Sequence, residues 1–192
     1  MRSLRLILLI LMCLIAMFSG AQTPKKIDIR AVARAGHLNG SKSEYENDYL
    51  GVTVRLPEPN ARLVLNSLIK EDRATLLEAV NMQGDANEWH KFAIVVESAD
   101  IPGLTSITQF VQTLRHQVER DGLQTVKAEV YVTIAGREFV ESELKMESES
   151  DHYYKAIMFT RTKGYLFGFW IEAKDREQLQ KATNLEGKIK FR

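Results

Sequence analysis

Cysteine is almost absent from this sequence. The single cysteine, Cys13, lies inside an apolar run at the N-terminus. One thiol cannot form an intramolecular disulfide, and thiolate zinc sites and iron–sulfur clusters need several cysteines. If the N-terminal run is removed as a signal peptide, as argued below, no thiol nucleophile remains either. The 171 residues left of 192 after residues 1–21 are enough to bury a core without such links.

An excess of charge of either sign is also missing. Removing Arg2 and Arg5 with the N-terminal run leaves 24 of the 26 basic residues against 25 acidic ones, a net charge of −1. Both signs are interspersed along the chain. This balance lacks the basic footprint of a protein that binds nucleic acid or an anionic membrane surface.

Motifs that carry catalysis are missing as well. The sequence contains no Gly-x-Ser-x-Gly elbow and no glycine-rich phosphate loop. The four histidines, His37, His90, His116 and His152, do not have the spacing of metal ligands. We therefore expect no enzyme activity and no cofactor.

The N-terminus has the pattern of a secretory signal peptide. Arg2 and Arg5 precede a run of 13 apolar residues, 6–18, and small residues follow at Ser19 and Ala21. Such a run matches the apolar region of a signal peptide and is shorter than the roughly 20 residues that span a bilayer. We expect cleavage before Gln22, export to the periplasm or beyond, and no membrane span in the mature chain. An uncleaved anchor, or a lipoprotein modified at Cys13, is the alternative.

The rest of the chain predicts one domain. Residues 22–43 are mostly polar and are interpreted as a linker with a short strand near 27–33, where apolar residues alternate with polar or small ones. The domain is expected over 44–192. Apolar runs predict strands at 51–56, 76–82 and 89–96, whereas 61–70 fits a strand or a helix equally well.

A helix and a series of hairpins complete the pattern. Ile107, Phe110, Val111, Leu114 and Val118 form one stripe of a helix over 106–121, with Gly122 at its end. From residue 125 the period changes to two, which predicts hairpins over 125–146 and 153–173. A short helix follows over 175–182, and then a closing strand over 187–191. This order predicts an α+β fold with an antiparallel sheet flanked by helices.

Several of these segments resemble PsbP-like domains. The opening segment 45–57 has Tyr-x-Asn followed by Leu-Gly and a strand that ends at proline, as these domains do. The turn at 135–139 resembles the turn of their central hairpin. The aromatic strand 164–170, the short helix after it and the final Lys-Ile-Lys-Phe of 188–191 are similar too. The resemblance covers residues 44–192. It implies an α-β-α sandwich with a binding or assembly role and no catalytic residues.

One row of acidic residues is a candidate partner or ion surface. Glu141, Glu143, Glu147, Glu149 and Asp151 fall on odd positions, with Lys145 between them. On a strand, these carboxylates share one face. They predict either a weak Ca²⁺ site, because hard cations take several oxygen ligands, or the solvated outer face of a hairpin.

An aromatic strand is the other candidate site. Phe167, Phe169 and Trp170 could line a ligand pocket, whereas alternation along the strand places most of this group in the core. We therefore expect an exported, non-catalytic binding or accessory protein whose partner is a protein or a small ligand. The alternative is a small-molecule carrier with an apolar pocket, and a hydrolase ranks third.

Overall fold

The computed structural model describes residues 28–41, 43–56, 61–81, 89–148 and 152–192. The expected signal peptide, residues 1–21, lies outside these ranges, so export remains a prediction. None of the described helices is both long enough and apolar enough to cross a membrane. In chain order the elements are α2 (Ile29–Arg34), β1 (Gly36–Leu38), β2 (Glu44–Asn47), β3 (Val52–Arg55), β4 (Arg62–Ile69), β5 (Arg73–Val80), β6 (Trp89–Ser98), α3 (Ile107–Arg120), β7 (Gln124–Ile134), β8 (Arg137–Glu147), β9 (His152–Thr162), β10 (Tyr165–Ala173), α4 (Arg176–Thr183) and β11 (Ile189–Phe191).

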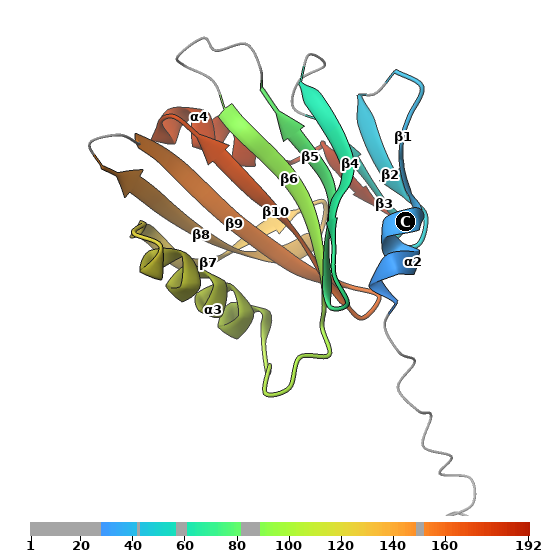
Figure 1. Cartoon of the computed structure of the whole chain (residues 1–192), viewed down its shortest axis with the longest axis horizontal. Helices are drawn as coiled ribbons and strands as arrows, with labels where there is room; N and C mark the ends of the chain where they lie inside the picture. The colour runs from blue at the N-terminus through green and yellow to red at the C-terminus, as the bar shows by residue number, and fades with distance from the viewer. Residues whose placement is uncertain (1–27, 42, 57–60, 82–88, 149–151) are drawn as a thin grey trace, which may run out of the picture.

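A seven-stranded antiparallel sheet forms the centre of the molecule (Figure 1). Its order is β4-β5-β6-β10-β9-β8-β7, so that β10 lies between β6 and β9. The predicted hairpins β7–β8 and β9–β10 are present, and Ala135 and Lys163 have positive φ in their tight turns. Residues 62–69, which fitted a strand or a helix, form the edge strand β4. The predicted α+β class with an antiparallel sheet is therefore the observed one.

A second, four-stranded sheet has the order β1-β2-β3-β11 and joins the two ends of the domain. The helix α2 precedes it, where we expected a linker with a short strand. Asp28 caps this helix by accepting a hydrogen bond from the amide of Ala31, at 3.0 Å. Ile29, Val32 and Ala33 are buried, because their spacing places them on one side of a helix. Residues 29–38 are thus part of the folded domain.

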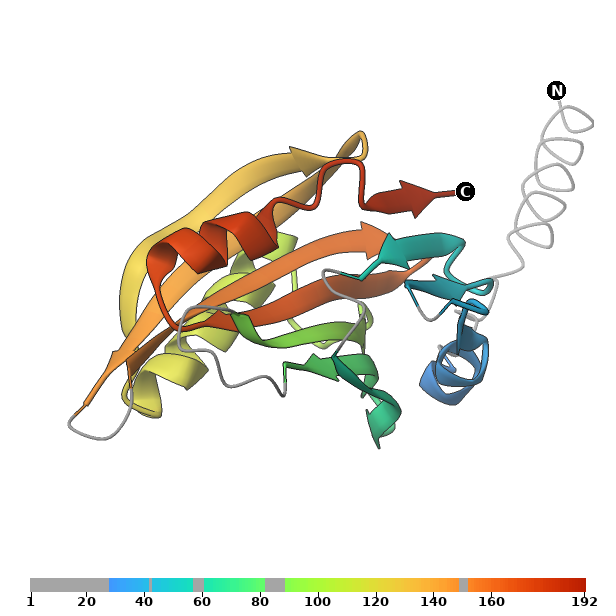
Figure 2. The ribbon, with the colours of Figure 1, turned by 90° about the horizontal axis from the view of Figure 1, so that it is seen from above.

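Helices cover opposite faces of the large sheet (Figure 2). On one face, Leu179 and Ala182 of α4 join a core with Phe167 and Phe169 of β10. On the other face α3 packs through the apolar stripe predicted from its sequence, and the ring of Phe110 meets Phe159 edge to face at 4.9 Å. The Ser106 hydroxyl caps α3 by accepting the Gln109 amide hydrogen bond, at 3.0 Å. The sheet therefore separates two hydrophobic cores.

Candidate functional site

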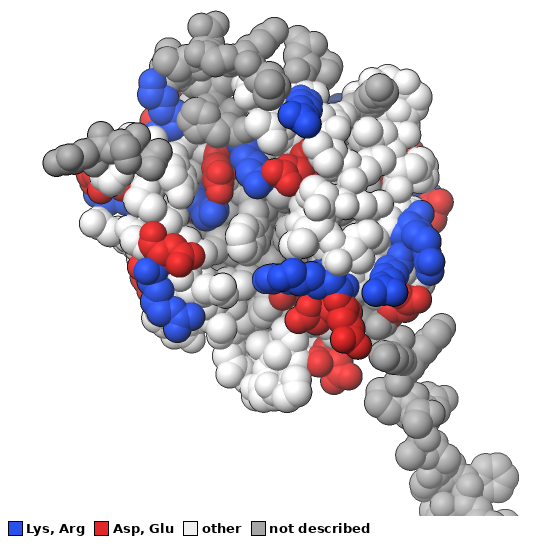
Figure 3. Space-filling model, in the orientation of Figure 1, with Lys and Arg blue, Asp and Glu red and all other residues white. Residues whose placement is uncertain are grey.

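A groove lies on the face of the large sheet that carries α3. The helix packs on β7, β8 and β9 and leaves part of β5, β6 and β10 without a helix above it (Figure 1). A cavity of about 480 Å³ occupies this space, bounded by side chains of these strands, of β9 and of α3. Figure 3 looks onto this face and shows charged side chains of both signs around a largely uncharged hollow. A volume of this size is typical of small-molecule sites.

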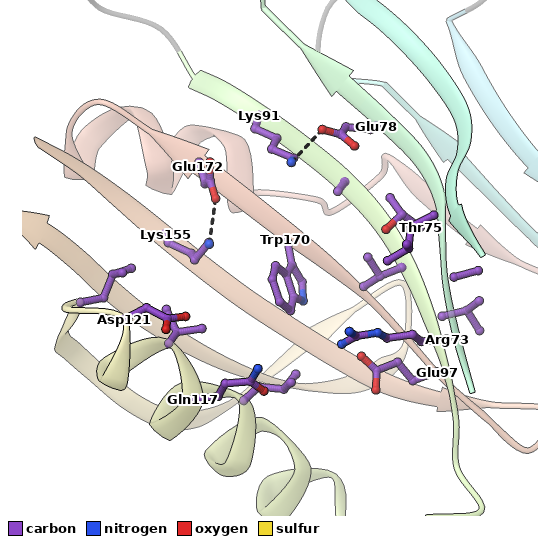
Figure 4. Close-up of a pocket in the computed structure, with 18 of the residues that line it drawn as sticks. Arg73, Thr75, Glu78, Lys91, Glu97, Gln117, Asp121, Lys155, Trp170 and Glu172 are labelled. Atoms are coloured by element: carbon purple, nitrogen blue, oxygen red, sulfur yellow. Dashed lines mark ion pairs between the residues drawn. The ribbon is translucent and has the colours of Figure 1, made fainter. Parts of the chain in front are cut away.

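The indole of Trp170 forms the floor of the groove (Figure 4). Its Nε1 atom is buried and has no hydrogen-bond acceptor among the described residues. A buried donor without an acceptor costs about 1–3 kcal/mol. The Lys155 ammonium lies 5.2 Å from the centroid of the indole, within the range of a cation–π interaction. Trp170 thus offers a flat apolar surface and an unused donor at the same place.

At one end of the groove the charged side chains form two ion pairs, and we call the residues Glu78, Lys91, Lys155 and Glu172 the paired end. Here Lys91 pairs with Glu78 at 2.7 Å and Lys155 pairs with Glu172 at 2.8 Å. The two pairs lie on neighbouring strands beyond the indole (Figure 4). The bond to Lys91, partly opposed by burial, lowers the pKa of Glu78. The Glu78 carboxylate is therefore held as an anion beside Lys91.

The opposite end contains hydrogen-bonding groups with few partners, and we call Arg73, Thr75, Glu97 and Trp170 Nε1 the donor end. These side chains lie on the side toward which the indole nitrogen points (Figure 4). Within the described ranges, no ion pair or hydrogen bond holds the Arg73 guanidinium or the Thr75 hydroxyl. Burial raises the pKa of Glu97 to about 7, although the charge of Arg73 lowers it and that of Asp72 raises it further. Near neutral pH, Glu97 therefore exists in both protonation states.

The aromatic residues predicted to line one pocket lie on two sides of the sheet. Phe167 and Phe169 are completely buried in the core beneath α4, with their ring centroids 5.3 Å apart. Trp170 points to the opposite face and lines the groove. The alternation of β10 explains this division, since neighbouring residues of a strand point to opposite faces. An apolar pocket made by all three residues is therefore not formed.

The acidic row is divided as well. Glu141 and Glu143 are buried, where we had considered a solvated face or a cation site. The Lys127 ammonium lies 3.0 Å from Glu141 and 3.3 Å from Glu143, and Arg176 at the start of α4 lies 3.3 Å from Glu143. Two side chains on β7 and α4, distant in sequence, thus neutralise these carboxylates.

The remaining acidic residues are less informative about a site. Glu147 is exposed and pairs with Lys145 at 2.6 Å. Glu149 and Asp151 lie outside the described residues. Across the described ranges, no three His, Cys, Asp or Glu side chains are grouped so that they could hold a metal ion.

The histidines occupy separate places. His37 is exposed on β1, His116 contacts Glu119 at 2.9 Å on α3, and His152 stacks edge to face on Tyr154 at 5.8 Å. His90 belongs to β6. His37, His116 and His152 do not line the groove.

Sequence reasoning missed most of the groove. The sequence analysis did not identify the charged residues of the groove, Arg73, Lys91, Glu97 and Lys155. Lys91 and Glu97 lie at the two ends of an apolar strand segment, on the same face of the strand. Charged residues that share a face with buried ones are a signal of a polar site inside the fold. Their partners come from other strands, so the pairing was not visible in the sequence.

Comparisons with known proteins agree with the fold. No protein-family model and no curated protein matches the sequence. The solution structure of cyanobacterial PsbP (CyanoP) from Synechocystis sp. PCC 6803 is similar, with a TM-score of 0.55, 8% identity, and coverage of 78% of this chain and 91% of that one. The crystal structure of LpqN, involved in cell envelope biogenesis of Mycobacterium tuberculosis, gives a TM-score of 0.47, 15% identity, and coverage of 72% and 81%. The chain therefore has the fold of PsbP-like domains, as its sequence motifs predicted.

Proposed function

We propose that this protein is an exported, non-catalytic accessory protein that binds a small amphipathic molecule in the groove. The observation that carries the proposal is the groove itself, where an apolar floor and unpartnered polar groups meet in a cavity of about 480 Å³. Convergent polar groups in an apolar pocket are the usual mark of a ligand site. The signal-like residues 1–21 support export, and the lack of a recognisable nucleophile motif in the sequence supports a role without catalysis.

Native mass spectrometry of the protein, isolated gently from its own host, tests this function. We expect an added mass of small-molecule size that is lost on denaturation. Thr75 is half-buried on the wall of the groove, so Thr75→Trp should fill the cavity and remove the added mass. Thr133 is exposed on the edge strand β7, and Thr133→Trp is the matched control that should keep it.

Two outcomes would contradict the proposal. A bare monomer in all three proteins would leave no ligand to explain and would favour a transient protein partner. An added mass that survives in a folded Thr75→Trp protein would place the ligand elsewhere. Circular dichroism of each variant shows whether it is folded.

A further inference from the structure

The two ends of the groove differ in what they can offer a ligand. At the paired end, Lys91 and Lys155 already have carboxylate partners at 2.7 and 2.8 Å. A charged ligand group there would have to replace an existing ion pair. At the donor end the Thr75 hydroxyl and the Trp170 indole N–H have no acceptor among the described residues. The Arg73 guanidinium faces Glu97 across the strands without forming an ion pair with it in the described part of the chain. The free hydrogen-bonding capacity of the groove is therefore mainly a capacity to donate.

The groove also has an apolar part, formed by α3 and the large sheet. Leu114 and Val118 of α3, Leu123 after it, and Val95 of β6 line the cavity together with the indole face. These side chains are nearly buried, so water has little access to them. The apolar part of a ligand that lies against them is therefore removed from water. A ligand that fits both parts needs an acceptor-rich head and an apolar body.

We propose that the groove binds an amphipathic monocarboxylate, whose carboxylate accepts hydrogen bonds at the donor end and whose apolar part lies between Trp170 and α3. This inference rests on the proposed function and specifies its ligand class. A carboxylate has two acceptor oxygens, which suit the planar donors of a guanidinium. It also gives the indole N–H the acceptor that it lacks in the protein.

The charge around Glu97 makes the binding depend on pH. Arg73 and Asp72 face Glu97 from the start of β5 and the turn before it, and α3 contributes Gln117 and the more distant Asp121 (Figure 4). When Glu97 is protonated, Arg73 is free to bind an anion, and the Glu97 hydroxyl can donate a hydrogen bond to that anion. Ionised Glu97 repels the anion and competes for Arg73. Because the pKa of Glu97 is about 7, affinity should fall as the pH rises through neutrality.

Titration calorimetry with three probes tests the class of ligand. Decanoate carries the head and the chain, decyltrimethylammonium carries the same chain with the opposite charge, and acetate carries the head alone. We expect saturable one-site binding of decanoate only. N-acetyl-diglycine offers the same carboxylate on a polar body without an apolar part, and tighter binding of it than of decanoate would overturn the proposal.

Variants of the donor end locate the binding. Arg73→Met should weaken decanoate binding about tenfold or more, since a hydrogen bond to a charged group contributes at least one factor of ten. Arg30→Met removes an exposed arginine of α2 and should leave the affinity unchanged. Equal losses in the two variants would overturn the proposal.

A spectroscopic signature and the pH profile separate a binding role from a structural one. The indole N–H resonance that disappears in Trp170→Phe should shift when decanoate is added to the wild type. Affinity for decanoate should fall by up to about tenfold for each pH unit above 7, and Glu97→Gln should remove this dependence. If the affinity of the wild type for decanoate does not change with pH, the carboxylate does not bind beside Arg73 and Glu97 as proposed. If decanoate fails while isolated protein carries another molecule that Thr75→Trp excludes, the ligand class is wrong and the proposed function stands.

Discussion

The pairing of Lys127 with Glu141 and Glu143 yields a stability prediction that can be worked from distances and burial. The two carboxylate side chains are only 6% and 5% exposed, and they share one ammonium at 3.0 and 3.3 Å. Burial lowers the pKa of Lys127, but the hydrogen bonds and charges of both glutamates outweigh it and raise the pKa above its ordinary value. The change Lys127→Met removes this cation and leaves the Glu141 carboxylate buried without the one cation that pairs with it among the described residues.

The expected loss in the free energy of unfolding is about 2–3 kcal/mol at pH 7. Removing one partner of a buried ion pair costs about 3–5 kcal/mol. For Lys127→Met the loss should lie at or below the lower limit of this range, because Lys127 is one third exposed and Arg176 still pairs with Glu143. Adding Glu141→Gln to the variant should recover at least half of the loss, since a neutral amide is buried at lower cost than a charge.

Urea denaturation followed by circular dichroism measures these differences. Lys181→Met is the matched control, because its pair with Glu177 joins side chains that are 63% and 77% exposed, and water and salt screen such a pair so that its loss should change stability little. If Lys127→Met costs no more than Lys181→Met, or if Glu141→Gln gives no recovery, the reasoning about the buried carboxylates is refuted.

Two further predictions concern β10, the strand that carries Trp170, and the donor end of the groove. A β-carbon at Gly168 would lie 2.1 Å from the Met158 carbonyl oxygen, so Gly168→Ala should destabilise the protein by about 2 kcal/mol or more, whereas Gly40→Ala, with no atom within 4 Å, should change little in the same urea titration. Burial raises the pKa of Glu97 from 4.5 to about 7, so its neutral form stabilises the fold at acidic pH, and that contribution, at most about 3 kcal/mol, is lost as the pH rises from about 4.5 to 7. Glu97→Gln should remove this part of the pH dependence, and identical pH profiles for variant and wild type would show that Glu97 is not buried as described.

Much of the fold could be predicted because single elements carry their own periodicity. The stripe of Phe110, Leu114 and Val118 identified α3 and its buried side, and the change to a period of two after residue 125 identified the hairpins β7–β8 and β9–β10. The helix α2 was missed, since six residues are too few for a helical stripe to differ clearly from alternation.

The site was harder to predict than the fold. Glu141 and Glu143 resembled a solvent-exposed row because their partners, Lys127 and Arg176, come from other elements. The groove exists because α3 covers β7, β8 and β9 and leaves part of β5, β6 and β10 uncovered. Which strands a helix covers is decided by tertiary packing. Only the whole arrangement shows that Arg73 and Trp170, almost a hundred residues apart, line one cavity.

The position of β10 has a consequence for the order of folding. Strands β4 to β6 are complete by residue 98 and strands β7 to β9 by residue 162, yet only β10, at residues 165–173, pairs with both groups. Pairing over such sequence separations is slow, because chain entropy is lost before the contacts form. Until β10 is in place, β6 and β9 each present an unpaired edge. A nascent chain therefore cannot complete the large sheet before residues 165–173 are available. A chain held unfolded until then does not expose folded β6 and β9 with unpaired edges.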